Sequence, residues 1–302
     1  MLFLFSLLSA KQLEFHLQKG SSEWSFSYEW KDAKKKMNEV SFSLPATAVQ
    51  ADAAIPVNPR MRELVDVEVK AAQDYAGTLH GIKLKVWRDD LSLRMSASTK
   101  TKTRKALKAA LNGANDAAQA AADRWLEQNG YMRVDETTIM VDYTRIVADY
   151  VDDVGPVAQA LGAADVDRSN EESVRAYLVR VLSFVQNIPY ESRSKNGGDA
   201  GFRRPLSLLA RNKGDCDGKA ALFLALVRAA LPDVPAGIVI VPDHAFVAVA
   251  VTPRKGDTTF KKDGVKYVAM EPVGPAVLRV GKLGSTAASR VRTGRFTFRA
   301  IP

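Results

Sequence analysis

A long apolar stretch directly after the only cysteine constrains the fold more than any other feature of this chain. Residues 219–231 consist almost entirely of alanine, leucine, phenylalanine and valine. Alanine and leucine favour the helical conformation, and a stretch that is apolar on all sides predicts a helix inside the core. Asp215 or Asp217 can cap the start of this helix, and Pro232 can end it. The sequence therefore predicts a buried helix with Cys216 at its N-terminal end.

The position of this cysteine suits a reactive thiol. A thiol at a helix N-terminus lies at the positive end of the helix dipole, which lowers its pKa and raises its nucleophilicity. The simpler alternative is a small buried hydrophobic residue, which is the usual role of a lone cysteine beside an apolar helix. The flanking Gly-Asp-Cys-Asp-Gly segment at 214–218 favours a turn at the surface of the core. We therefore expect a lowered thiol pKa.

Short strands follow the predicted helix and end beside residues that suit catalysis. Residues 237–241 and 244–251 are expected to be strands joined by a Pro-Asp turn, and an Asp-Gly hairpin turn precedes a strand over 265–270. His244 opens the second strand, and Glu271 follows the last one. A thiol, an imidazole and a carboxylate are the parts of a cysteine-nucleophile active site. Of the three histidines in the chain, only His244 lies in the same predicted unit as the cysteine.

Three segments carry a resemblance to a known family: RRPLSLLARNKGDCDGKAALFLALVRAAL, VIVPDHAFVAVAV and YVAMEPVGP. They resemble the core of the bacterial transglutaminase-like superfamily, and FVQNIPY resembles the helix end that precedes the cysteine segment in such domains. The resemblance covers roughly residues 170–280, about a third of the chain. It implies an α+β fold with a papain-like core, in which a cysteine helix packs on an antiparallel sheet and a Cys-His-Asp triad performs catalysis.

The resemblance assigns Cys216 as the nucleophile, His244 as the general base and Glu271 as the residue that orients the imidazole. Family members usually have aspartate at the last position, so the longer glutamate is either absorbed by a small backbone shift or marks a weakened or lost activity. The main-chain N–H of the nucleophile is one oxyanion donor. The candidates for the second donor are Gln186, Asn187 and Tyr190.

These residues predict an amide hydrolase, most simply a cysteine peptidase with a protein or peptide substrate and no required cofactor. A thioester acyl-enzyme would be resolved by water in a peptidase and by an amine in a protein transamidase. The alternative is a catalytically inactive binding or scaffold protein on the same fold. Some exported relatives bind calcium through acids that flank the cysteine. Helix capping is the favoured role of Asp215 and Asp217, because two carboxylates make a poor calcium site.

The chain of 302 residues is longer than one hydrophobic core usually supports, so two units are expected. We place a mixed accessory region at 11–160 and the catalytic domain at 161–302. In the accessory region, alternating aromatic residues predict a hairpin over 24–30 and 40–44 whose aromatic face points inward. The other expected elements are strands at 63–70, 82–87 and 91–95, a long helix over 100–128, and helices at 143–163 and 171–187.

The two ends of the chain indicate where it acts. Residues 1–10 form an apolar run that resembles a remnant of a secretory signal peptide, although an ordinary first strand is the alternative. We expect a periplasmic or otherwise exported protein, and a cytoplasmic one if the run is a strand. Residues 252–302 carry eleven Lys/Arg and three Asp/Glu, and hence +8 of the formal net charge of +9. The favoured role of this basic region, with an expected strand through 290–299, is general solubility and repulsion between molecules. The alternative is contact with an anionic surface; no nucleic-acid partner is expected.

Overall fold

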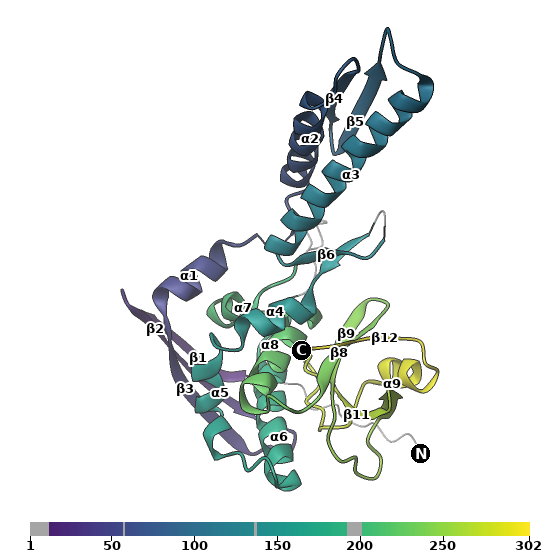
Figure 1. Ribbon diagram of the computed structural model, residues 1–302. Helices are drawn as coiled ribbons and strands as arrows, with labels where there is room; N and C mark the ends of the chain where they lie inside the picture. Colours follow the sequence, from purple (N-terminus) through teal and green to yellow (C-terminus); the bar gives the residue numbers. More distant parts are fainter. Residues whose placement is uncertain (1–11, 57, 136–137, 192–200) are drawn as a thin grey trace, which may run out of the picture. The chain divides into compact units, whose positions relative to one another are not determined.

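The computed structural model describes residues 12–56, 58–135, 138–191 and 201–302 (Figure 1). The chain divides into two compact units. One is made of Met1–Val57 and Tyr143–Pro302, and the other of Asn58–Asp142. Both contain helices and antiparallel strands, so the expected α+β class is confirmed at that level. No helix within the described residues is long and apolar enough to cross a membrane.

The larger unit contains a five-stranded antiparallel sheet with the order β10-β11-β9-β8-β12. Its strands are β8 (Ala236–Val241), β9 (His244–Val249), β10 (Thr259–Lys262), β11 (Val265–Met270) and β12 (Thr297–Ala300). Asp243 and Asp263 adopt positive φ angles of 63° and 50°, which two-residue hairpin turns require and aspartate tolerates. The two predicted hairpins are thereby confirmed, and they bring the start of β9 and the end of β11 to the same sheet edge.

The predicted apolar helix is α8 (Cys216–Ala230), and it lies against β8 and β9 (Figure 1). Its other sides contact four helices, which is why every face of α8 is apolar. These helices are α4 (Tyr143–Tyr150), α5 (Gly155–Ala160), α6 (Glu171–Asn187) and α7 (Pro205–Arg211). Leu222, Phe223 and Leu224 of α8 are all 0% exposed. Burial of each such side chain contributes about 1.5–3 kcal/mol, so α8 fixes the core on which the cysteine is mounted.

The opposite face of the five-stranded sheet has its own apolar cluster. Phe246 of β9 and Tyr267 of β11 pack there with residues of α9 (Ser285–Arg292). The sheet is therefore buried on both faces, with α8 on one side and α9 on the other. The expected strand through 290–299 is only partly correct, because 285–292 is helical and β12 begins at Thr297.

A second, three-stranded antiparallel sheet belongs to the same unit. It contains β1 (Gln12–Lys19), β2 (Glu23–Lys31) and β3 (Met37–Pro45), and α1 (Ala46–Ala54) follows it. The predicted aromatic hairpin is confirmed by β2 and β3. Trp30 donates from Nε1 to Ser183 Oγ at 3.0 Å, and the Tyr28 ring lies 5.1 Å from the Phe184 ring. These contacts with α6 make the N-terminal strands part of the unit that holds the cysteine.

The unit boundaries therefore differ from the expected division near residue 160. Sequence order suggested an accessory region up to that point, but the aromatic face of β2 packs on α6 of the larger unit. The separate unit is instead the insertion of Asn58–Asp142. The expected helix over 143–163 is interrupted as well, since α4 ends at Tyr150 and α5 begins at Gly155, followed by a short 3-10 helix at Ala163–Asp165.

The inserted unit consists of two long helices, a hairpin and a small two-stranded ladder. The elements are α2 (Met61–Gly77), β4 (Lys83–Asp89), β5 (Ser92–Ser98), α3 (Arg104–Gln128), β6 (Tyr131–Arg133) and β7 (Ile139–Val141). The strands predicted at 82–87 and 91–95 and the long helix are confirmed, but the strand expected at 63–70 is wrong. β-Branched residues in that stretch favour a strand, yet Leu64, Val65 and Ala72 are buried at helical spacing. Packing on α3 overrides the local propensity.

Candidate active site

The start of α8 is held by tight local packing. Asp215 is the N-cap residue, and its Oδ1 accepts a hydrogen bond from the Gly218 main-chain N–H at 2.8 Å. This confirms capping as a role of Asp215. A Cβ atom at Gly218 would lie 2.7 Å from the carbonyl oxygen of Arg203, so no larger residue fits there without moving the main chain. The glycines around the cysteine thus allow the helix start to approach its neighbours closely.

His244 and Glu271 meet at the sheet edge where β9 begins and β11 ends. The His244 Nε2 atom lies 2.8 Å from Glu271 Oε2, and the side chains are 28% and 9% exposed. The second carboxylate oxygen accepts from the Val273 main-chain N–H at 3.2 Å. Both oxygens of Glu271 are therefore engaged, which fixes the carboxylate and leaves Nδ1 as the imidazole nitrogen available for another partner.

The thiol of Cys216 lies beside the start of β9. The main-chain N–H of Ala245, the residue after His244, donates to the sulfur. The sulfur also lies 3.4 Å from Asp217 Oδ1. Within the described part of the chain, no hydrogen bond joins Cys216 directly to His244. The structure thus brings Cys216, His244 and Glu271 close together, and the thiol contacts the Asp217 carboxylate.

The electrostatic surroundings of the thiol differ from the sequence expectation. Burial, followed by the negative charge of Asp217, raises the pKa of the Cys216 thiol to about 12. The lowered pKa expected from the helix dipole is therefore wrong for this conformation, because the dipole is outweighed by desolvation and by an adjacent carboxylate. Asp217 is itself held in place, since Tyr143 Oη donates to its Oδ2 at 2.6 Å.

The pKa of His244 is shifted in the opposite direction to that of an ordinary buried histidine. Burial alone lowers the pKa of an imidazole, because it disfavours the charged form. Here the hydrogen bond and charge of Glu271, together with the charge of Asp217, outweigh burial and raise the pKa of His244 above its ordinary value. Glu271 therefore stabilises an imidazolium, which is what a base needs after it has accepted a proton.

The amides considered as oxyanion donors have other partners. Gln186 donates from Nε2 to the carbonyl oxygens of Glu271 at 2.7 Å and of Leu278 at 3.0 Å. Asn187 donates from Nδ2 to those of Lys31 and Ser183. The Gln186 amide therefore braces the main chain at Glu271, whereas the Asn187 amide joins the end of α6 to β2. Tyr190 is 47% exposed and forms an isolated bridge with the segment before the cysteine, so it stays a candidate.

One residue of the site was missed by sequence reasoning. Lys219 lies three residues after the cysteine and is 0% exposed, with its ammonium group hydrogen bonded to main-chain oxygens at the end of α6. Burial lowers the pKa of Lys219 to about 7, against an opposing effect of Glu271. The available signal was a lysine inside a stretch predicted to be a buried helix, since lysine is almost never fully buried without a partner.

No group of three or more His, Cys, Asp or Glu side chains suited to a metal ion occurs among the residues that the structure describes. The two acids considered for calcium have protein partners. Asp215 caps α8, and burial raises its pKa to about 6. Asp217 accepts from Tyr143 and faces the thiol.

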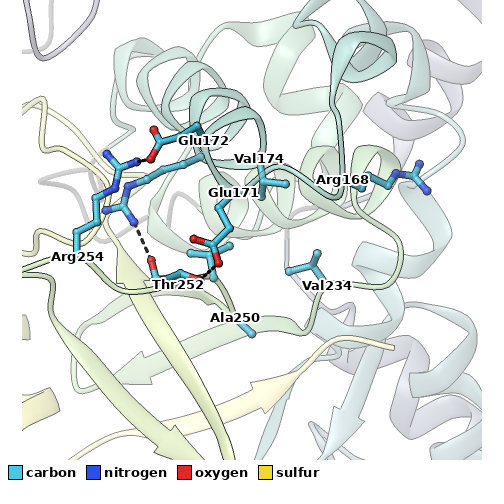
Figure 2. A pocket seen from close by; sticks show the side chains of 10 residues that line it. Arg168, Glu171, Glu172, Val174, Val234, Ala250, Thr252 and Arg254 are labelled. Carbon is cyan, nitrogen blue, oxygen red and sulfur yellow. Dashed lines mark hydrogen bonds and ion pairs between the residues drawn. The ribbon is translucent and has the colours of Figure 1, made fainter.

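A separate cavity of about 240 Å³ lies at the other end of α6 (Figure 2). At about 1.5 Å per residue, the 17 residues of α6 place it roughly 25 Å from the helix end that braces the triad. Arg254 pairs with Glu172, and Thr252 donates to Glu171, while Arg168 points away (Figure 2). Arg175, which also lines the cavity, pairs with Asp257 outside the lining at 2.8 Å. The cavity is thus remote from the cysteine.

Comparisons with protein-family models, with curated proteins and with solved structures found no match for this chain. The assignment of a function therefore rests on the residues and geometry given above.

Proposed function

We propose that the chain is a cysteine-nucleophile amide hydrolase, most simply a peptidase, with a papain-like core of the transglutaminase-like type. The observation that carries the proposal is the 2.8 Å hydrogen bond between His244 Nε2 and Glu271 Oε2, beside the helix that begins with Cys216. This pairing leaves Nδ1 to serve the thiol. A base oriented by a carboxylate next to a nucleophile at a helix N-terminus is the arrangement that acyl transfer requires.

In the proposed reaction, His244 acts as a general base at the moment of attack. It accepts the Cys216 proton while the sulfur attacks the carbonyl carbon of a peptide or protein amide. The resulting imidazolium, stabilised by Glu271, then protonates the leaving amine as the C–N bond breaks. This leaves a thioester on the enzyme. A water molecule, deprotonated by the same imidazole, attacks the thioester carbon, releases the acid and restores the thiol.

A specific observation favours the second candidate, an inactive binding or scaffold protein. The Cys216 thiol contacts the Asp217 carboxylate, and burial together with this carboxylate raises the pKa of the thiol to about 12. A glutamate also stands where the family usually has aspartate. A protein transamidase remains the variant of the first proposal in which an amine resolves the thioester.

We propose further that the protein is exported and that its basic C-terminal region contacts an anionic surface. Arg292 and Arg295 support the contact with an anionic surface, because both side chains are exposed. The apolar run at 1–10, which suggested export, lies outside the described residues. No cofactor is required by the proposed reaction.

The test is acylation by p-nitrophenyl acetate, an activated ester that reports each turnover by colour. Attack by Cys216 forms an acetyl thioester and releases p-nitrophenolate. The proposal predicts a burst of p-nitrophenolate, an added acetyl group on Cys216 by mass spectrometry, and no burst in Cys216→Ala. Methylamine that shortens the lifetime of the thioester by capturing the acetyl group would favour the transamidase. Equal colour release by wild type and Cys216→Ala would instead support the scaffold protein.

A further inference from the structure

We infer that Lys219 is a positioning residue for the proposed triad: its buried amino group ties the cysteine helix to the end of α6 and compensates the charge of Glu271. This inference rests on the proposed function. Lys219 touches neither the sulfur nor the imidazole through any hydrogen bond of the described residues, and it acts through its neighbours.

The first part of the tie joins two helices. Lys219 lies one turn after Cys216 on α8, and its Nζ atom donates to the carbonyl oxygens of Ile188 at 2.6 Å and Gln186 at 3.4 Å. These carbonyls lie at the C-terminal end of α6, where the last four carbonyl groups have no partner within the helix. The helix dipole is negative there, so an ammonium group is favoured. Each bond therefore joins the cysteine helix to a fixed point of the core.

The second part of the tie reaches the triad. Gln186 receives Lys219 at its main-chain oxygen and donates from its side chain to the main-chain oxygen of Glu271 at 2.7 Å. Both Gln186 and Glu271 are buried, at 1% and 6% exposure. A chain of hydrogen bonds thus runs from the helix that carries the nucleophile to the strand end that carries the orienting carboxylate. A shift of either one is passed on to the other.

Charge gives a second reason for this lysine. A buried carboxylate is costly unless a cation compensates it, and a buried lysine is costly for the same reason. The charged groups around this position are Glu271, which directly follows β11, His244 of β9, and Asp217 and Lys219 of α8. Glu271 favours the charged form of both Lys219 and His244, so Lys219 is a second cationic partner of this carboxylate at and below about pH 7.

The experiment compares Lys219→Met, which keeps the length of the side chain but has no donor or charge, with Lys213→Met. Lys213 is exposed and lies six residues earlier, so it controls for the loss of one positive charge. Three quantities are measured: alkylation of Cys216 by iodoacetamide at pH 6.5, where Lys219 is mostly charged, the NMR titration midpoint of His244, and unfolding in urea. We expect Lys219→Met to slow alkylation at least tenfold and to raise the His244 midpoint, because Glu271 loses its other cation.

The unfolding measurement separates positioning from support of the fold. Removing one member of a buried charge pair leaves its partners uncompensated, so Lys219→Met is expected to unfold at a lower urea concentration than wild type. Alkylation and the His244 midpoint are therefore compared without urea, where both proteins are folded, so that a change in either quantity reports positioning. If Lys219→Met keeps the wild-type alkylation rate and His244 midpoint, or if Lys213→Met changes them equally, the inference is overturned.

A second variant keeps the inference testable if Lys219→Met does not fold. In wild type, the NMR titration of the Lys219 side chain is expected near its pKa of about 7. In Glu271→Gln this midpoint is expected to fall, because the carboxylate favours the charged amine. An unchanged midpoint would show that the two groups are uncoupled and would overturn the inference. Failure of the proposed function is visible separately, as alkylation that His244→Ala leaves unaltered while the Lys219–Glu271 coupling persists.

Discussion

Replacing Asp217 with asparagine is expected to make Cys216 more reactive towards iodoacetamide at neutral pH. The Asp217 carboxylate lies 3.4 Å from the sulfur and opposes formation of the thiolate. Asparagine has nearly the same shape, and its amide oxygen can still accept the hydrogen bond from Tyr143. The substitution therefore removes the negative charge and keeps the packing.

The size of the effect follows from the causes of the raised pKa. The pKa of the Cys216 thiol is raised to about 12, with burial as the largest cause and Asp217 second. A change of about one pKa unit, the scale of a single close charge interaction, corresponds to a roughly tenfold change in the thiolate fraction. Nucleophilicity falls as thiol pKa falls, with a Brønsted coefficient of about 0.4–0.5. The expected net gain in the alkylation rate is therefore about 3- to 4-fold.

The assay is the rate of alkylation at pH 7.5, followed by intact mass. Asp243→Asn serves as the matched control, because Asp243 is exposed, precedes His244 and loses the same charge without contact with the sulfur. The control is expected to react at the wild-type rate. A rate for Asp217→Asn at or below wild type would refute the reasoning, as would an equal gain in Asp243→Asn.

Three further outcomes are expected. Glu271→Gln lowers the pKa of His244, because the hydrogen bond and charge of Glu271 raise it; an unchanged NMR midpoint would contradict this. Asp215→Asn raises the free energy of unfolding at pH 7 by up to about 3 kcal/mol. The reason is that burial raises the pKa of Asp215 to about 6 in the folded protein, so its contribution to stability is complete below about pH 4 and is lost as pH rises through 6. Urea unfolding at pH 4 and 7 measures this difference, and a gain of equal size at both pH values would contradict it. Finally, vesicles containing phosphatidylglycerol are expected to bind wild type and to lose about 30-fold in affinity when two C-terminal charges are neutralised, at about 1 kcal/mol each. The test variant is Arg292→Gln/Arg295→Gln, and the control is Lys102→Gln/Lys105→Gln. Equal losses of affinity in the two variants would contradict the assignment.

Much of the larger unit could be predicted from the sequence because its local signals agree with its packing. The bounds expected for α6 at 171–187 match the structure, since Asn170 caps the helix as the sequence pattern indicates. The cysteine helix and the hairpins around it were also predictable, from an apolar stretch and from turn residues that adopt positive φ angles.

The incorrect predictions concern features that depend on contacts between residues distant in the sequence. Valines favoured a strand at 63–70, but packing on α3 makes α2 helical. The unit boundary was misplaced because the aromatic side chains of β2 pack on α6, which lies some 150 residues later in the chain. In the site, the helix dipole was visible in the sequence, whereas the burial of Cys216 and the orientation of Asp217 were not. Both of these depend on the folded geometry.

The central claim is that His244 takes the proton of Cys216 during nucleophilic attack. The most direct test measures alkylation of Cys216 by iodoacetamide from pH 5 to 9 in wild type, His244→Ala and His16→Ala. His16 is an exposed histidine and serves as the control. We predict that the wild-type rate rises with the raised titration midpoint of His244, that His16→Ala behaves in the same way, and that His244→Ala reacts at least tenfold more slowly at pH 7.5. A rate that follows only the thiol titration, and that is equal in wild type and His244→Ala, would contradict the claim.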